Sequence, residues 1–136
     1  MKQLILLLLL PVFSYSQELN TALNFHNLVR GYYDLKPLKH NDSLDIIAQS
    51  RADNMANKNE IYFNNNSLYG ESVFYTDYFS LGRDYYLEAS VGWALDDVEN
   101  ITLKQMLCND CKEIGFGLSV SDDKIYIVAI YDKLYN

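Results

Sequence analysis

The chain has 136 residues, of which 18 are Asp or Glu and 11 are Lys or Arg, so its formal net charge is −7 at pH 7. The basic residues form no run or stripe of the kind that neutralises phosphates, which argues against nucleic acid as a partner. An apolar content of 49% with twelve tyrosines excludes a disordered chain and predicts one packed domain.

The N-terminus predicts a signal peptide. Lys2 precedes the apolar run Leu4–Phe13, and small residues follow at Ser14 and Ser16. The run is too short for a transmembrane helix, which needs about 20 apolar residues. We therefore expect cleavage after residue 16 and secretion of a monomeric single domain, residues 17–136, without a membrane span. It would be extracellular, or periplasmic in a Gram-negative bacterium.

Two helices are predicted in the first half of the chain. Apolar residues recur at a spacing of three to four over residues 19–33, which places them on one helix face. Pro37 interrupts the pattern. A second helix is expected to start behind Asp42 or Ser43, both good N-cap residues, and to end near Asn59.

The rest of the chain alternates strand and helix patterns. In order, we expect a strand over 68–76, a helix over 81–97, a short helix over 103–107, and strands over 113–120 and 125–131. The last two runs flank a polar turn and predict an antiparallel hairpin. The order predicts an α+β fold in which helices cover an antiparallel sheet.

Cys108 and Cys111 are the two cysteines of the sequence and are spaced C-x-x-C. Export favours a local disulfide between them, although free thiols and a redox or metal role remain alternatives. A thioredoxin-like motif would open a helix after a strand, whereas this pair follows a helical stretch and precedes a strand. The absence of nearby histidines makes a zinc site unfavourable.

The first two predicted helices carry a resemblance to a known family. Residues 25–58, FHNLVRGYYDLKPLKHNDSLDIIAQSRADNMANK, resemble the opening of domains of the CAP superfamily, which contains cysteine-rich secretory proteins, insect venom antigen 5 and plant pathogenesis-related proteins. That opening has an H-N-x-x-R helix, a P-L loop and an A-Q-x-x-A-x-x-M helix. The matching residues are His26, Asn27, Arg30, Pro37, Leu38, Leu44, Ala48, Gln49, Ala52 and Met55.

Three later segments extend the resemblance. Gly70-Glu71-Ser72 resembles the family's G-E-N, Trp93 resembles the tryptophan of its third helix, and residues 105–118, QMLCNDCKEIGFGL, resemble the stretch ending in I-G-x-G. The resemblance implies an SCP-like extracellular domain with an α-β-α sandwich, in which helices flank a central antiparallel sheet.

The resemblance also implies a surface cleft. In many members, two histidines and two acidic residues line it and can hold zinc or another divalent ion. Here Glu71 occupies one acidic position and Asp96 is the candidate for the other, whereas Thr102 stands at one histidine position and Glu60 stands near the second. Because imidazole is missing, we expect no zinc, catalytic residue or resident cofactor; Ca²⁺ on the oxygen ligands remains an alternative.

Neither histidine of the sequence replaces the missing cleft ligands. His26 belongs to the H-N-x-x-R pattern and is expected to be a packing or hydrogen-bonding residue, while His40 is expected to face solvent. No histidine is therefore placed to activate a serine, threonine or cysteine nucleophile.

The leading hypothesis is a non-catalytic extracellular binding module whose partner is another extracellular protein. One alternative is a carrier of a small apolar ligand, a lipid or sterol, with Phe74, Phe79 or Phe116 in its groove. The other is a hydrolase that uses Glu71 with Asp96 and Thr102, because paired carboxylates can divide acid and base roles.

Overall fold

The computed structural model describes residues 20–63, 68–77, 83–96 and 101–135. The expected signal peptide, residues 1–16, and Phe79 lie outside these ranges. The elements are a helix over residues 20–32, here the N-terminal helix, followed by β1 (Lys39–His40), α2 (Asp42–Lys58), β2 (Gly70–Asp77), α3 (Tyr85–Ala94), α4 (Ile101–Met106), β3 (Glu113–Ser121) and β4 (Lys124–Tyr131).

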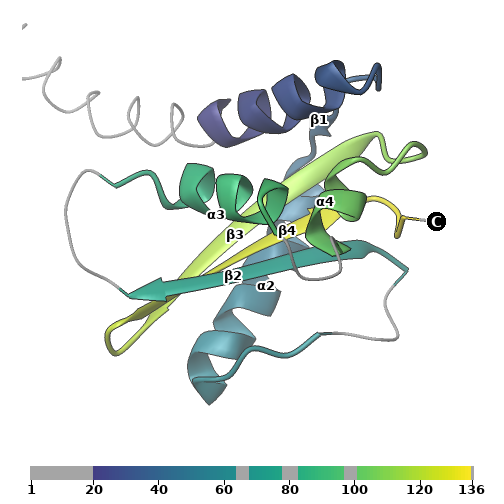
Figure 1. Cartoon of the computed structure of the whole chain (residues 1–136). Helices are drawn as coiled ribbons and strands as arrows, with labels where there is room; N and C mark the ends of the chain where they lie inside the picture. Colours follow the sequence, from purple (N-terminus) through teal and green to yellow (C-terminus); the bar gives the residue numbers. More distant parts are fainter. Residues whose placement is uncertain (1–19, 64–67, 78–82, 97–100, 136) are drawn as a thin grey trace, which may run out of the picture.

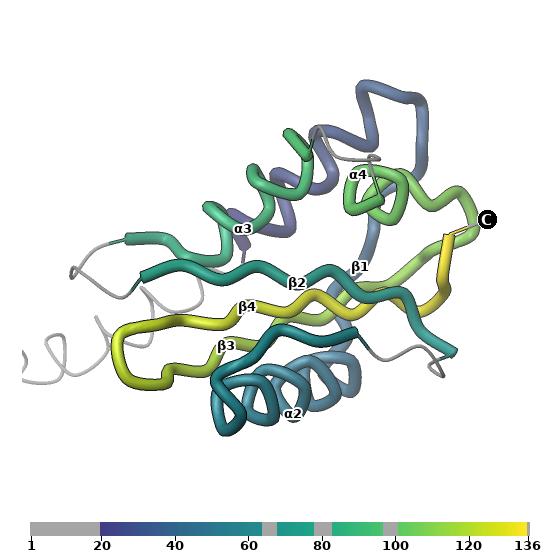
Figure 2. The backbone as a smooth tube through the Cα atoms, turned by 60° about the horizontal axis from the view of Figure 1, so that its bottom comes forward, coloured from purple at the N-terminus to yellow at the C-terminus, as the bar shows by residue number. Residues whose placement is uncertain are grey.

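The elements form three layers, which confirms the predicted α+β class and helix-flanked sheet. The sheet has the strand order β1-β3-β4-β2. α2 covers one face, and the N-terminal helix, α3 and α4 cover the other (Figures 1 and 2). The predicted hairpin is β3–β4, and β2 pairs antiparallel with the outer side of β4. The sequence did not predict β1, a two-residue edge strand that runs parallel to β3.

β4 lies in the middle of the sheet and is buried on both faces. Its alternate side chains therefore belong to two cores. Those that face the N-terminal helix, α3 and α4 are Ile125, Ile127, Ala129 and Tyr131, and those that face α2 are Tyr126, Val128 and Ile130. This burial explains why the strand is almost uniformly apolar instead of alternating with polar residues.

α2 packs directly on the backbone of β3. A Cβ atom at Gly115 or Gly117 would collide with backbone atoms of α2, so glycine permits this close approach. Side chains of α2 also satisfy backbone groups of β3: Asp45 accepts a hydrogen bond from the Phe116 N–H (2.8 Å), and Gln49 bonds both the N–H and the C=O of Leu118 (3.2 and 2.6 Å). The I-G-x-G stretch is thus a helix-docking surface.

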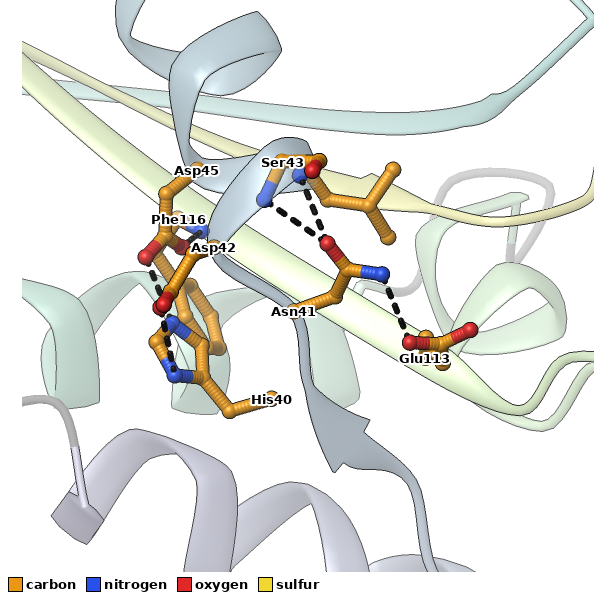
Figure 3. Close-up of polar contacts among 8 residues, drawn as sticks. His40, Asn41, Asp42, Ser43, Asp45, Glu113 and Phe116 are labelled. Atoms are coloured by element: carbon orange, nitrogen blue, oxygen red, sulfur yellow. Dashed lines mark hydrogen bonds and ion pairs between the residues drawn. The ribbon is translucent and has the colours of Figure 1, made fainter.

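The cap at the start of α2 differs from the sequence expectation. Asn41, rather than Asp42 or Ser43, is the N-cap, because its Oδ1 accepts hydrogen bonds from the backbone N–H groups of Ser43 (2.7 Å) and Leu44 (3.2 Å). The Asn41 amide also donates to Glu113 at the start of β3 (2.6 Å; Figure 3). An asparagine amide can do both because its oxygen accepts and its NH₂ group donates, whereas an ionised carboxylate could only accept.

The other helix ends follow ordinary capping rules. α2 ends near Asn59, as predicted: Lys58 is its last residue, and Asn59 is the C-cap, with a φ of 51° in the left-handed conformation that asparagine tolerates. α3 is shorter than the expected 81–97 because Asp84 caps it, with its side chain accepting a hydrogen bond from the Leu87 N–H (3.0 Å). The start of α3 is therefore set by the Asp84 cap, which the apolar pattern of the sequence did not predict.

Candidate functional site

Glu71, the first residue of the expected cleft, points toward α2. Its two carboxylate oxygens accept hydrogen bonds from Arg51 Nε (3.0 Å) and Nη2 (2.7 Å), and Nη2 also donates to the carbonyl oxygen of Tyr62 (2.8 Å). The two charged side chains are only 10% and 8% exposed, respectively for Arg51 and Glu71. The hydrogen bond with Glu71 raises the pKa of Arg51. The carboxylate is therefore committed to a bidentate ion pair.

Asp96 and Thr102 lie on the other face of the sheet, where α3 gives way to α4. The Thr102 hydroxyl oxygen is 3.0 Å from Asp96 Oδ2 and 2.9 Å from the carbonyl oxygen of Trp93. The structure thus brings these two predicted residues together and turns Glu71 away from them toward α2. Glu60 is exposed just beyond α2. In this geometry, the contacts of Thr102 with Asp96 and Trp93 join α4 to the end of α3.

His26 is a core residue, as the sequence predicts. Its ring is fully buried, with Nδ1 donating to the Ala22 carbonyl oxygen (3.0 Å), so Nε2 accepts the hydrogen bond of the Tyr131 hydroxyl (2.8 Å). Burial, with a smaller contribution from the nearby Arg30 charge, lowers the pKa of His26 to about 4 against the opposing effect of the hydrogen bond to Ala22. His26 is therefore neutral at physiological pH and has no free nitrogen for a metal.

His40 is exposed, as expected, but it is not isolated. Its Nε2 lies 2.6 Å from Asp45 Oδ2, and its Nδ1 lies 3.7 Å from Asp42 Oδ1 (Figure 3). These three residues each offer a ligand atom within 4.8 Å of the others. The other oxygen of Asp45 is bound to the backbone of Phe116. The group is a surface hydrogen-bond cluster at the start of α2, and no other feature of the described residues points to a bound ion there.

Arg30 binds three separate segments together. It is 1% exposed, and its guanidinium donates to carbonyl oxygens of Lys36 (2.8 Å), Met106 (2.9 Å), Cys108 (2.8 Å) and Cys111 (3.4 Å). These carbonyls come from the loop after the N-terminal helix, the end of α4, and the turn that follows it. Burial lowers the pKa of Arg30, but guanidinium remains charged in proteins. A single buried cation thus fixes this end of the molecule.

The predicted disulfide between Cys108 and Cys111 is present, with 5.3 Å between the two Cα atoms. It closes the turn between α4 and β3, so it does not open a helix as a thioredoxin-like pair would. Cys111 Sγ lies 3.1 Å from the Lys133 carbonyl oxygen, which also accepts a hydrogen bond from Gln105 (2.8 Å). The bridge is therefore part of the same framework that Arg30 holds.

A hollow of about 680 Å³ lies over this framework. Four lysines and three acidic residues line it: Lys36, Lys39, Lys112, Lys133, Asp34, Asp110 and Glu113. A smaller hollow of about 280 Å³, lined by Lys104 and Tyr135, shares the turn at Asn109 and Asp110 with it. We call the two together the lysine hollow. Sequence reasoning missed it because its lysines are spread from position 36 to position 133, and only the fold gathers them.

Comparisons with known proteins identify the fold. The model of the cysteine-rich secretory protein family, CAP, matches residues 23–131. No curated protein gives a significant match. Several solved structures are similar at low sequence identity, among them the three that follow. Na-ASP-1 has a TM-score of 0.65 at 14% identity over 82% of this chain and 37% of its own. The structure of NaASP2 with Zn²⁺ has a TM-score of 0.66 at 14% identity, and the match covers 82% of this chain and 77% of that protein. Venom allergen-like protein 4 of Schistosoma mansoni has a TM-score of 0.58 at 21% identity, and the match covers 86% of this chain and 92% of that protein.

Proposed function

Because the chain belongs to the CAP family of cysteine-rich secretory proteins, we propose that it is a secreted, non-catalytic module that binds another extracellular protein. The observation that carries this proposal is the state of Glu71, whose two oxygens are both held by Arg51 in a contact that solvent hardly reaches. A carboxylate that acts as a base or metal ligand must direct an accessible lone pair at its target. This carboxylate stabilises the fold instead.

The position of Glu71 also argues against the hydrolase alternative. It requires Glu71 to work with Asp96 and Thr102, but Glu71 faces α2 while the other two residues lie at the junction of α3 and α4. Paired acid and base groups must approach the same substrate atoms. The separation of these three residues by the sheet favours a binding role over catalysis.

The apolar-carrier alternative also gains little support. Phe116 is 4% exposed and Phe74 packs against the same core, so both rings contribute to the interior instead of a groove. The hollow of about 680 Å³ is lined mainly by charged and polar side chains. Ligand sites for lipids are lined mainly by apolar groups. A protein partner is therefore the better match to this surface.

Secretion is part of the proposal and can be measured directly. None of the helices in the described ranges is long and apolar enough to cross a membrane. The apolar run at Leu4–Phe13 has the length of a signal peptide core. We expect the exported protein to begin at Gln17, as intact-mass spectrometry of culture supernatant would show; a secreted form that retains Leu4–Phe13 would contradict this.

The binding role is tested with the mature chain immobilised and exposed to culture supernatant. A binding module should retain a partner in a fixed ratio, release it to excess free chain, and leave its mass unchanged. Glu71→Gln should retain the same partner to the same extent if the variant is folded, because Glu71 is structural. Recovery of the partner as cleaved fragments, with cleavage lost in Glu71→Gln, would show that the protein is an enzyme.

A further inference from the structure

The positive charges of this acidic protein are concentrated at one end. The sequence has eight lysines, and five of them line the lysine hollow although the chain carries a net charge of −7. Among the described residues, none of these five ammonium groups forms an ion pair. Lys58 and Lys124 lie elsewhere, each over a tyrosine ring. The lysine hollow thus offers ammonium groups that are not engaged in salt bridges within the described part of the chain and that an incoming anion could meet.

The floor of the lysine hollow is rigid and itself carries positive charge. Arg30 lies beneath it, buried, and its hydrogen bonds run to four carbonyl oxygens, with no carboxylate among them. The disulfide from Cys108 to Cys111 closes the turn between the two parts of the hollow. A partner would therefore meet a preformed surface, and little conformational entropy would be lost in ordering it.

The acidic residues of the lysine hollow restrict the kind of anion that fits. The larger part has four lysines and three carboxylates, a net charge of +1 (4 − 3). Asp34, Asp110 and Glu113 would repel a uniformly charged polymer such as a sulfated polysaccharide. A protein segment can place carboxylates against the lysines and hydrogen-bond donors against the carboxylates, which is the usual complementarity of protein interfaces.

We propose that the lysine hollow is the docking site for an acidic, extended segment of a protein partner. This inference rests on the proposed binding function and names the surface and the partner's chemistry. The segment's carboxylates would meet Lys39 and Lys112, which lie side by side because the Lys39 N–H of β1 donates to the carbonyl oxygen of Lys112, the residue just before β3 (2.9 Å). Lys36, Lys104 and Lys133 surround them and would add longer-range attraction.

The probe is a fluorescently labelled eight-residue peptide of alternating glutamate and serine, titrated against the mature chain at low ionic strength. We expect Lys39→Gln/Lys112→Gln to weaken binding about tenfold, and higher salt to weaken binding to the unaltered chain, because exposed charges are screened. The matched control Lys58→Gln/Lys124→Gln removes the same charge at positions outside the lysine hollow. It should change the affinity less than about twofold. Thermal melts of both variants check that each is folded.

Three results would overturn the inference. They are equal losses in the two double variants, no measurable binding of the peptide, or a heparin oligosaccharide that binds more tightly than the peptide with the same dependence on Lys39 and Lys112. The last would replace the acidic protein segment by a polyanionic glycan. If the partner from culture supernatant is retained intact but regardless of Lys39→Gln/Lys112→Gln, the binding function stands and this site is wrong. If binding of the peptide depends on Lys39 and Lys112 but the partner is cleaved, the proposal of a non-catalytic function is wrong.

Discussion

Two buried arginines, one on each side of the sheet, have opposite electrostatic surroundings. Arg51 of α2 meets the carboxylate of Glu71, so the pair is neutral as a unit. Arg30 of the N-terminal helix meets only carbonyl oxygens among its hydrogen-bond partners. Both side chains organise backbone groups, but Arg30 has no carboxylate among its hydrogen-bond partners in the described residues and is influenced by Asp132 only through space.

The difference explains where this molecule can interact. On the α2 face, the ion pair consumes the acidic residue that the family resemblance assigned to the cleft. At the other end, the four lysines of the larger part of the lysine hollow exceed its three acidic residues by one, and Arg30 beneath them has no carboxylate among its hydrogen-bond partners in the described ranges. Glu71 is held in the ion pair with Arg51, and the binding surface that we propose, the lysine hollow, lies apart from it.

Replacement of Arg30 should have the largest effect. In Arg30→Met, four buried or partly buried carbonyl oxygens lose their donor, and we expect a loss of about 4 kcal/mol in the free energy of unfolding. Arg30→Lys keeps the charge but not the planar fork and should recover less than half of that loss. Urea unfolding measures both. A loss below about 1 kcal/mol for Arg30→Met would show that water replaces the guanidinium easily.

Breaking the ion pair on the α2 face should cost slightly less. Arg51→Met leaves the Glu71 carboxylate buried without a partner, and we expect a loss of about 3 kcal/mol. The double variant Arg51→Met/Glu71→Met removes both charges and should regain most of that stability. Denaturant unfolding of the two single variants and the double variant forms a complete cycle. Strictly additive losses would contradict a coupled, neutral pair.

The pH dependence of stability tests the surroundings of His26, which lies near Arg30. His26 has a pKa of about 4 in the folded protein, below its value of 6.5 in the unfolded chain. The unfolded state therefore binds a proton first as the pH falls, so the stabilising contribution is complete above pH 6.5 and is lost as pH falls toward 4. The full difference corresponds to about 3 kcal/mol.

An NMR titration in the His40→Asn background observes His26 alone. We expect its ring signals to stay those of the neutral imidazole at pH 5, while urea unfolding shows decreasing stability from pH 7 to pH 5. Ring signals that titrate near pH 6.5 in the folded protein would mean that His26 is neither desolvated nor influenced by Arg30.

The disulfide should contribute least. It closes a loop with a sequence separation of three, so its effect on the entropy of the unfolded chain is about 2 kcal/mol or less. We expect Cys108→Ser/Cys111→Ser to remain folded with a modest drop in melting temperature, because Arg30 still holds the carbonyl groups of the turn. A loss above about 3 kcal/mol would show that the bridge, more than Arg30, fixes this end of the molecule.

Sequence patterns were sufficient where the burial was regular. The β3–β4 hairpin follows from its apolar runs and polar turn, and α2 follows from its apolar stripe. The strand β1 could not be predicted, because two residues that pair with a distant segment carry no periodic signal. The pairing of β2 with β4 likewise joins segments that lie far apart in the sequence, so no local pattern indicates it.

The candidate site was predictable only in part. The sequence identified Glu71, but its partner Arg51 lies 20 residues earlier, and their contact depends on how α2 crosses the sheet. It also identified the H-N-x-x-R pattern without the reason for its arginine, whose carbonyl partners lie as far as 81 residues away. Such long-range polar contacts depend on tertiary packing, which periodicity does not encode.

The central claim is that Glu71 serves the fold and leaves no metal site in the expected cleft. Calorimetric titration of Zn²⁺ into the metal-free mature chain tests it directly, with Glu71→Gln to probe the cleft and His40→Asn to probe the cluster at the start of α2. We predict no one-to-one binding at micromolar affinity that depends on Glu71, and weak binding at most that depends on His40. One-to-one binding at micromolar affinity or better, abolished by Glu71→Gln and unaffected by His40→Asn, would contradict the account.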